Sequence, residues 1–470
     1  MSEKTVIEQK KEQLFYASKD AGVVLNEQEI AAADAYCEGY KQFLDAAKTE
    51  REAVNEAIRQ AEAKGFRPFV RGEALKAGDK VYYNNRGKSL FVAVIGEKPI
   101  ADGVSIAAAH IDSPRLDLKP NPLYEDHSLA YFDTHYYGGI KKYQWVAMPL
   151  SLHGVIVRKD GTSVTVSIGD DANDPVFCVS DLLPHLAADQ MKRTASDLIK
   201  GEDLNVLIGS RPFMGDEGSE AVKLNILNIL FEKYGIIEAD FLSAELEVVP
   251  AFGARDVGFD RSLIGAYGHD DRVCAYPALT AIFELNRPAY TALTILADKE
   301  EIGSDGNTGM QSAALEHFIA DLAAAFNTEC RYVLQNSMCL SADVNVAFDP
   351  IYPEVTEQRN CAFLNRGIVL TKYTGARGKS GTSDASAELM GFFRKNMDDN
   401  AVLWQVGELG KVDIGGGGTV AKYIANLDIN TVDLGVPVLS MHAPFEIVSK
   451  TDVYMAHRAF LALLSRTENL

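Results

Sequence analysis

Apolar positions along the chain follow a helical period up to about residue 64. They include Ile30 and Phe43, and the spacing places them on one face of a helix. Asn26 precedes this run as a candidate N-cap, and Gly65 follows it as a candidate stop. The pattern therefore predicts a helical N-terminal region.

Beyond residue 69 the pattern changes to short apolar runs typical of strands, which alternate with helical periods after residue 250. The first predicted strands cover 80–83, 89–95 and 103–109, and the last of these leads into His110 and Asp112. Later strands are predicted at 292–296, 338–346, 368–371, 403–406 and 431–434, and helices at 272–285, 308–326, 383–394 and 451–464. This alternation predicts an α/β fold with a central mixed sheet and helices on both faces.

In residues 118–250 the pattern of apolar and polar positions differs from that of the flanking regions. Alternating runs at 153–158 and 163–168 are separated by the turn signal Lys159-Asp160-Gly161, and one helix is predicted at 220–234. We expect a mostly antiparallel β domain at 118–250, inserted into a discontinuous domain formed by 1–117 and 251–470.

Composition narrows the possible partners and the compartment. The 470 residues carry a net charge of −20, which argues against nucleic acid or an anionic membrane as a partner. No apolar run reaches the roughly 18 residues of a membrane span, and the polar N-terminus does not resemble a signal peptide. Six scattered cysteines without a C-x-x-C pair are typical of reduced thiols. We therefore expect a cytoplasmic protein.

Acidic residues and histidines recur where predicted strands end or helices begin. These candidate metal ligands are His110, Asp112, Asp270, Asp271, Glu300, Glu301, Asp343 and His442. In open α/β sheets, loops at the carboxyl ends of strands converge on one site. A mixed nitrogen and oxygen set suits zinc, manganese or cobalt. Two such ions roughly 3.5–4 Å apart need a bridging carboxylate.

The pair Glu300-Glu301 suggests a division of labour. Neighbouring side chains on extended backbone point to opposite sides, so one glutamate can bind metal while the other transfers protons. Asp343 interrupts an apolar run, where an unpaired buried carboxylate is costly. Ordinary structural roles compete for two others: Asp112 can cap a turn before a proline, and Asp270 can cap a helix.

Three segments carry a family resemblance. Residues 109–116 (AHIDSPRL), 298–304 (DKEEIGS) and 440–443 (SMHA) resemble signature segments of the M18 metallo-aminopeptidases. Residues 243–251 and 432–437 support the match, which runs in the family's order from about residue 80 to 455. The resemblance implies a zinc-peptidase fold in which 118–250 is a dimerisation domain. It also implies homo-oligomers, commonly dodecamers built from dimers.

The resemblance also implies roles for the candidate residues. Two zinc ions, replaceable by cobalt or manganese, would be held by His110, Asp270, Glu301, Asp343 and His442. Glu300 would be the general base, and Asp112 would orient His110 from behind. Relatives carry Leu-Asp-Asn where this chain has His269-Asp270-Asp271, so Asp271 stays open as an alternative bridge.

The implied substrate is a peptide with a free N-terminus. Lys372 and Lys379, from a small basic cluster, are candidates to bind a substrate carboxylate or the peptide backbone, and Gly417 is a candidate wall of the substrate pocket. His185 lies in a segment resembling one from the family's dimerisation domain, and we assign it to substrate binding. Aspartyl-type relatives carry a further histidine where this chain has Asp189, which argues against strict aspartyl specificity.

Two other functions use the same residues differently. An amidase or deacylase on the same scaffold would employ the same two metals, because a fold does not determine a reaction. A peptide-binding assembly protein without activity would be expected to lack ligands, whereas every expected position here holds a competent side chain. We therefore favour a metal-dependent aminopeptidase.

Overall fold

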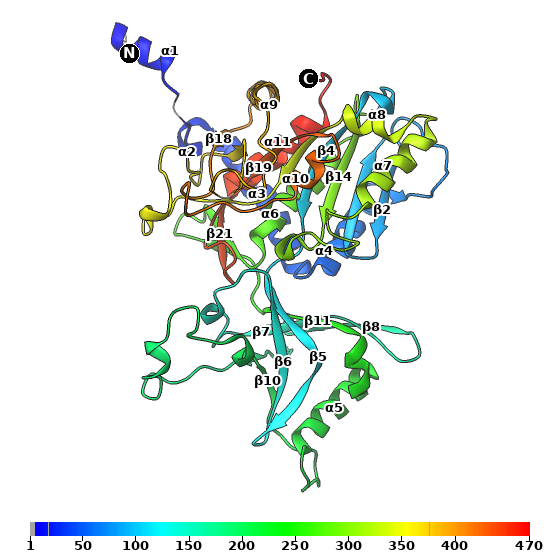
Figure 1. The fold of residues 1–470 in the computed structure, drawn as a ribbon, viewed down its shortest axis with the longest axis vertical. Coiled ribbons are helices and arrows are strands. Elements are labelled where there is room, and N and C mark those ends of the chain that lie inside the picture. The colour runs from blue at the N-terminus through cyan, green and yellow to red at the C-terminus, as the bar shows by residue number, and fades with distance from the viewer. Residues whose placement is uncertain (1–4, 17, 376) are drawn as a thin grey trace.

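A nine-stranded sheet forms the centre of the larger part of the molecule (Figure 1). The computed structural model describes residues 5–16, 18–375 and 377–470. In spatial order the central sheet contains β1 (Arg67–Pro68), β2 (Lys80–Asn85), β3 (Ser89–Val94), β14 (Thr291–Ala297), β4 (Val104–His110), β15 (Met338–Ala342), β19 (Asn430–Gly435), β17 (Ile368–Thr371) and β18 (Trp404–Val406). Both parallel and antiparallel pairs occur, so the predicted mixed sheet is confirmed.

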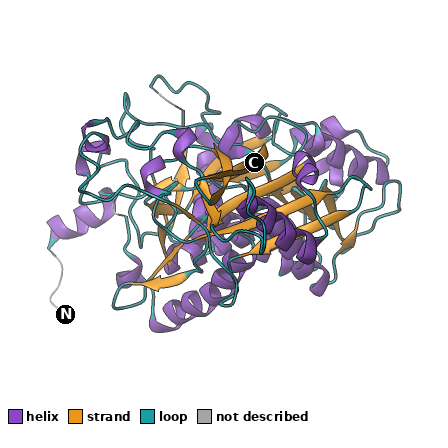
Figure 2. Ribbon diagram, turned by 90° about the horizontal axis from the view of Figure 1, so that it is seen from below, coloured by secondary structure: helices purple, strands orange, loops and turns teal. Residues whose placement is uncertain are grey.

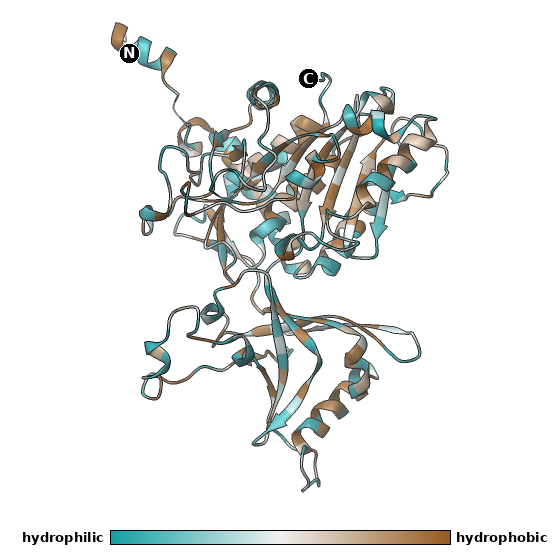
Figure 3. Ribbon diagram, viewed as in Figure 1, coloured by the Kyte–Doolittle hydropathy of each residue, from teal (hydrophilic) through white to brown (hydrophobic). Residues whose placement is uncertain are grey.

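Helices cover both faces of this sheet because its strands are apolar on both sides. In β4, Ala107 and Ala109 face one core while Ile106 and Ala108 face the other. The first core is covered by α3 (Glu27–Ala46), α4 (Glu50–Ala63), α6 (His269–Phe283), α9 (Ala387–Asp399) and α11 (Lys450–Leu464), and the second by α7 (Ala314–Ala325), α8 (Cys330–Gln335) and α10 (Ala421–Ala425). Figure 2 shows helices flanking the strands, and Figure 3 shows brown, hydrophobic stretches along the middle strands of the sheet.

Within residues 5–16 and 18–64, the described part of the N-terminal region, the chain is helical as predicted, in four pieces. They are α1 (Val6–Leu14), α2 (Ala21–Val24), α3 and α4. Asn26 caps α3 by accepting hydrogen bonds from the backbone N–H groups of Gln28 and Glu29. Gly65 follows the end of α4 with a φ of +85°, a conformation that glycine adopts without strain. No helix among the described residues combines the length and apolar character that a membrane crossing requires.

A second, seven-stranded sheet lies apart from the first and is antiparallel throughout (Figure 1). Its strands in spatial order are β8 (Ser163–Ile168), β7 (Leu150–Val157), β11 (Ala244–Pro250), β5 (Arg115–Asp126), β6 (Leu129–Tyr137), β10 (Val206–Gly209) and β9 (Cys178–Val179), with α5 (Ala221–Tyr234) packed beside them. Trp145, Leu150 and Val248 belong to its own core. We call residues 115–250 the inserted β unit; its role in dimerisation stays a prediction.

A third, five-stranded sheet was not predicted. It contains β12 (Arg255–Val257), β13 (Leu263–Ala266), β21 (Glu446–Ser449), β20 (Pro437–Leu439) and β16 (Asn345–Val346). The single strand predicted at 338–346 is therefore wrong: the chain leaves the central sheet after Ala342 and joins the third sheet at Asn345. The helix predicted from residue 308 also begins late, at Ala314, because turns occupy 308–313.

The topology brings three strand ends to one edge of the central sheet. Strands β14, β4 and β15 are adjacent and parallel, with Ala297 opposite His110 and Ser341 opposite Ala108. Whatever follows these strands must therefore lie close together.

Candidate metal centre

The predicted ligands converge at this edge of the central sheet. His110 ends β4, Glu300 and Glu301 lie in a short 3-10 turn after β14, and Asp343 follows β15. Asp270 comes from the first turn of α6, and His442 from the loop between β20 and β21. Five separate segments thus supply six side chains, as the recurrence of acids at strand ends predicted.

One group of three candidate ligands surrounds His110. Its Nε2 lies 3.2 Å from Asp270 Oδ1 and 3.6 Å from Asp343 Oδ1. His110 is fully buried and the aspartates are nearly so. One nitrogen and two carboxylate oxygens within 4.8 Å of one another can hold a metal ion.

A second group of three surrounds His442. Its Nε2 lies 3.1 Å from Asp270 Oδ2 and 3.6 Å from Glu301 Oε2. Asp270 therefore belongs to both groups and directs a different oxygen to each. This is the arrangement that a carboxylate bridging two cations requires.

Hydrogen bonding inside the centre is incomplete in a way that fits two cations. His110 Nε2, Asp270 Oδ1 and Glu301 Oε1 are buried and make no hydrogen bond in the described part of the chain. Leaving buried polar atoms without a hydrogen bond is costly. Metal coordination would satisfy all three, so the residues present fit the expected ions.

In the protein without metal, the pKa values of two candidate ligands, Asp270 and Glu301, shift in opposite directions. Burial alone would favour neutral Asp270, but His110 and His442 hold the pKa of that carboxyl below its usual range. Burial and the neighbouring Asp270 instead raise the pKa of Glu301 well above its ordinary value. A bound divalent cation would favour the ionised form of both.

Asp271 differs from Asp270 in its surroundings. Its Oδ2 accepts a hydrogen bond from the backbone N–H of His110 at 3.3 Å, and its buried Oδ1 has no hydrogen-bond partner among the described atoms. Burial, with Asp343 and Asp270 nearby, raises the pKa of Asp271 well above its usual value. Asp271 contacts the backbone of His110, whereas Asp270 lies against both histidine rings. The position of Asp270 is the one that a bridging carboxylate requires, and its role as the bridge stays a prediction.

Asp112 lies behind the first group and contacts more than the predicted histidine. Its Oδ1 is 3.3 Å from His110 Nδ1, which is also 3.0 Å from the Asp112 carbonyl oxygen. The same carboxylate accepts the backbone N–H groups of Glu300 and Glu301, each at 3.1 Å. One buried acid therefore orients both the His110 ring and the glutamate turn.

Glu300 lies beside the two groups without belonging to either. Burial first, and then the negative charges of Asp343 and Asp270, raise its pKa to about 8, and His110 opposes this effect. A cation bound nearby would lower that pKa again. The extended backbone expected for Glu300 and Glu301 is wrong, since both lie in a 3-10 turn, and the separate roles of the two glutamates stay predictions.

Sequence reasoning missed Glu446. This buried carboxylate accepts the backbone N–H of Asp270 at 3.0 Å through Oε2 and that of His442 at 2.7 Å through Oε1. It thereby joins two segments that supply ligands. Its only signal in the sequence was an acid four residues after His442, which carries no recognisable motif.

The four predicted substrate-binding residues lie outside the two groups. Lys372 and Lys379 both pair with Asp384, at 2.7 and 3.2 Å. Gly417 lies in the loop after β18, and His185 is exposed on a loop of the inserted β unit. In the described ranges, no hydrogen bond or ion pair links these four residues to the candidate ligands, and their roles stay predictions.

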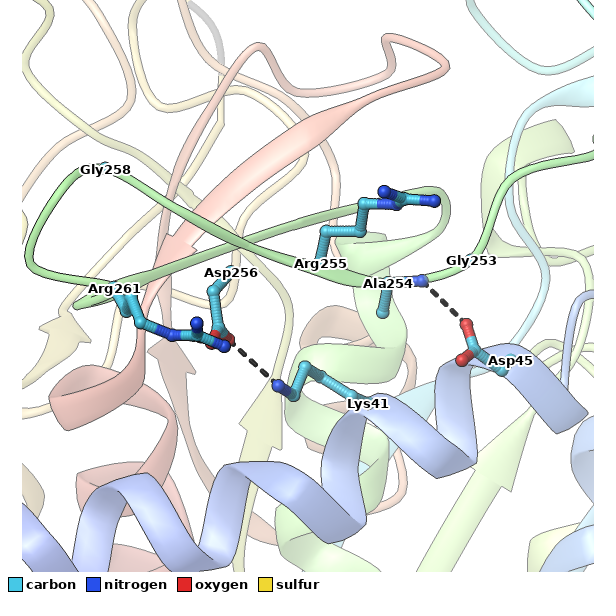
Figure 4. Close-up of a pocket in the computed structure, with 8 residues that line it drawn as sticks. All are labelled: Lys41, Asp45, Gly253, Ala254, Arg255, Asp256, Gly258 and Arg261. Carbon is cyan, nitrogen blue, oxygen red and sulfur yellow. Dashed lines mark hydrogen bonds and ion pairs between the residues drawn. The ribbon is translucent and has the colours of Figure 1, made fainter.

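A surface pocket between α3 and the loops around β12 is separate from the metal centre (Figure 4). Lys41 pairs with Asp256 at 2.9 Å, and Asp45 accepts the backbone N–H of Ala254 at 2.7 Å. Arg261 also pairs with Asp256, so the charges within this pocket are largely satisfied internally. None of its lining residues is a candidate ligand.

Comparison with known proteins identifies the family. Residues 43–463 match the family model described as aminopeptidase I zinc metalloprotease (M18). A probable M18 family aminopeptidase 1 from Clostridium acetobutylicum is 52% identical over 455 residues, covering 95% of this chain and 98% of the relative. The corresponding protein from Thermotoga maritima is 46% identical and covers 92% and 96%.

Solved structures agree with this result. The crystal structure of the M18 aminopeptidase from Thermotoga maritima superposes with a TM-score of 0.91 at 44% identity, covering 96% of this chain and all of that one. The mApe1 dodecamer of S. cerevisiae has a TM-score of 0.75 at 20% identity, over 92% of this chain and 96% of that one, and shows the shared fold alone. The chain therefore belongs to the M18 family of zinc aminopeptidases.

Proposed function

We propose that the protein removes N-terminal residues from peptides at a centre holding two zinc ions per chain. The observation that carries the proposal is the pair of ligand groups sharing Asp270, each with one histidine and one further carboxylate. Cobalt or manganese would suit the same donors. Zinc ions bound there would polarise the scissile carbonyl and lower the pKa of an attacking water.

Glu300 is the general base in this proposal. It removes a proton from the attacking water and later delivers that proton to the departing amine, so it ends the cycle ionised as it began. Its place beside both groups but outside them supports this role, because its carboxylate is not needed as a ligand. Asp112 contacts the backbone of Glu300 and the ring of His110, and so fixes the position of the base relative to the first group.

The need for a free amine separates this function from a deacylase. We expect N-acetylation of a good peptide substrate to reduce kcat/KM at least about 100-fold, because a site built to recognise a charged amine leaves its polar groups unpaired with the blocked peptide. The measurement compares the acetylated and free peptides of one sequence by chromatography of the products. Release of acetate, or equal cleavage of both peptides, would favour the amidase or deacylase.

Four residues are proposed to contact the substrate. Lys372 and Lys379 are proposed to bind a carboxylate of the substrate, although Asp384 already offsets part of their charge. Gly417 is proposed as a wall of the pocket, and His185 as a contact from the inserted β unit. A screen of aminoacyl substrates with acidic, basic and apolar residues would identify the preferred N-terminal residue.

We also propose a homo-oligomer built from dimers through the inserted β unit. The mApe1 relative is a dodecamer. In this chain α5 exposes Leu224, Ile229 and Phe231, with 56% of Phe231 accessible, and an apolar surface of this kind favours burial against another protein. Light scattering should give about twelve times the chain mass of 51.3 kDa. A monomer at working concentration would contradict the proposal, and Phe231→Asp should reduce the mass if α5 forms the contact.

A further inference from the structure

One segment of the inserted β unit reaches into the metal centre, where it contacts the second ligand group directly and the first through Asp112. It consists of Tyr137, the last residue of β6, and the two residues after it, Gly138 and Gly139. We propose that this Tyr137–Gly139 segment orients both candidate histidine ligands, with Tyr137 as a positioning residue. The inference rests on the proposed function, since it concerns residues that support its metal ligands.

Tyr137 acts on the first group through Asp112. Its hydroxyl donates a hydrogen bond to Asp112 Oδ2 at 2.9 Å. Asp112 in turn lies against the Nδ1 of His110. The Tyr137 hydroxyl therefore holds the Asp112 carboxylate in place, and that carboxylate orients the His110 ring. Groups that hold a metal ligand from behind in this way tune both its orientation and its basicity.

The Tyr137 ring is itself held in place. The guanidinium of Arg115 lies 4.0 Å from the centre of the ring, an arrangement in which the cation is attracted to the aromatic face. Arg115 is buried and paired with Glu50 at 3.0 Å and with Asp117 at 2.7 Å. The hydroxyl therefore meets Asp112 from a fixed direction.

Gly139 acts on the second group. Its carbonyl oxygen accepts a hydrogen bond from Nδ1–H of His442 at 2.8 Å. A proton on Nδ1 leaves the lone pair on Nε2, the nitrogen that faces Asp270 and Glu301. The backbone of the inserted β unit thus selects the tautomer that can bind a metal.

Gly138 permits the close approach that both contacts need. A Cβ atom on this residue would lie 3.3 Å from both Cβ and Oε2 of Glu301, and 3.4 Å from Cα of Pro114. Its φ of +76° is also in the left-handed region that favours glycine. A side chain here would press on a candidate ligand of the second group.

The segment makes the inserted β unit part of the metal centre. The chain leaves the first ligand loop at Arg115, runs out along β5, and returns along β6 to Tyr137, so the two strand ends lie opposite each other in register. A displacement of this hairpin would move the supports of His110 and His442 together.

The first test replaces the hydroxyl alone. Tyr137→Phe should weaken zinc binding about 10–100-fold and lower kcat with little change in KM, because the contact supports a ligand and not the peptide. Zinc affinity is measured by competition with a chromophoric chelator, and ligand geometry by the absorption spectrum of the cobalt form. The matched control is Tyr82→Phe, which removes a hydroxyl bonded to Glu62 at 2.7 Å on β2, outside the centre.

The second test adds one methyl group to the segment. Gly138→Ala is compared with Gly161→Ala, since Gly161 also lies in the inserted β unit and has a φ of +85°, but nothing lies within 4 Å of its added Cβ. Both variants carry the same kind of backbone strain. Only Gly138→Ala should lower zinc affinity and alter the cobalt spectrum.

The outcomes separate this inference from the proposed function. If the wild-type protein binds two metals and cleaves peptides, while Tyr137→Phe and Gly138→Ala match it in zinc affinity, cobalt spectrum and kcat, the segment has no positioning role. If the wild-type protein neither binds metal nor cleaves peptides, the proposed function itself fails. Losses in the two variants without losses in their controls would support the segment's role.

Discussion

The Glu300→Gln variant should keep both metal ions, and its kcat should fall about 10³-fold. A fall of this size is within the range usual for removal of a general base. The amide has nearly the same shape as the carboxylate but cannot accept the proton of the attacking water. Glu300 belongs to neither ligand group, so the metal content should not change. KM should change little, because the proton is transferred only as the reaction proceeds.

The measurement combines steady-state kinetics on a free-amine peptide with elemental analysis of the same sample. Glu316→Gln, at an exposed position on α7, is the control for the charge change. Undiminished turnover in Glu300→Gln would remove Glu300 as the base. Loss of one metal together with turnover would instead make it a ligand.

Asp270→Asn should lose both metal ions, whereas Asp343→Ala should weaken only one site. The reason is geometric: the two oxygens of Asp270 face different histidines, at 3.2 and 3.1 Å, whereas Asp343 faces His110, at 3.6 Å, and belongs to the first group. The amide keeps one oxygen where the carboxylate had two, so one group loses a donor, and both groups lose the negative charge that offsets repulsion between two cations.

Zinc per chain after gel filtration is the measurement, with circular dichroism to verify folding. Asp271→Asn is the matched comparison, because Asp271 is the neighbouring buried acid and accepts a hydrogen bond from the backbone of His110. If Asp271→Asn lost both metals and Asp270→Asn kept them, the two assignments would be exchanged. Full occupancy in Asp343→Ala would remove Asp343 from the ligand set.

Local runs of apolar residues were sufficient to predict most strands of the central sheet. The apolar run at 292–296 became the core of β14, and the run at 368–371 became β17 without change. Strands buried on both faces read as continuous apolar runs bounded by turns, and this signal is local. The third sheet was missed because its strands have two to four residues and pair across long distances, such as Leu263 with Ser449.

The candidate site was accessible to sequence reasoning because buried acids are costly. Asp343 stands in an apolar region, and Glu300-Glu301 follows a strand buried along its full length, so both needed a compensating partner. The choice between Asp270 and Asp271 was not accessible in the same way. Two adjacent residues of one type differ only in the direction of their side chains, which packing decides.

The sequence by itself determined the family, the two main kinds of sheet and the set of acids and histidines at the strand ends. Local periodicity and residue chemistry carry that information along the chain. Only the tertiary structure decided which oxygen faces which histidine, that Glu446 and Gly139 hydrogen-bond candidate ligand residues, and that Tyr137 hydrogen-bonds Asp112. Gly139 and His442 stand 303 positions apart, and a hydrogen bond to a backbone carbonyl leaves no residue signature for a sequence pattern to report.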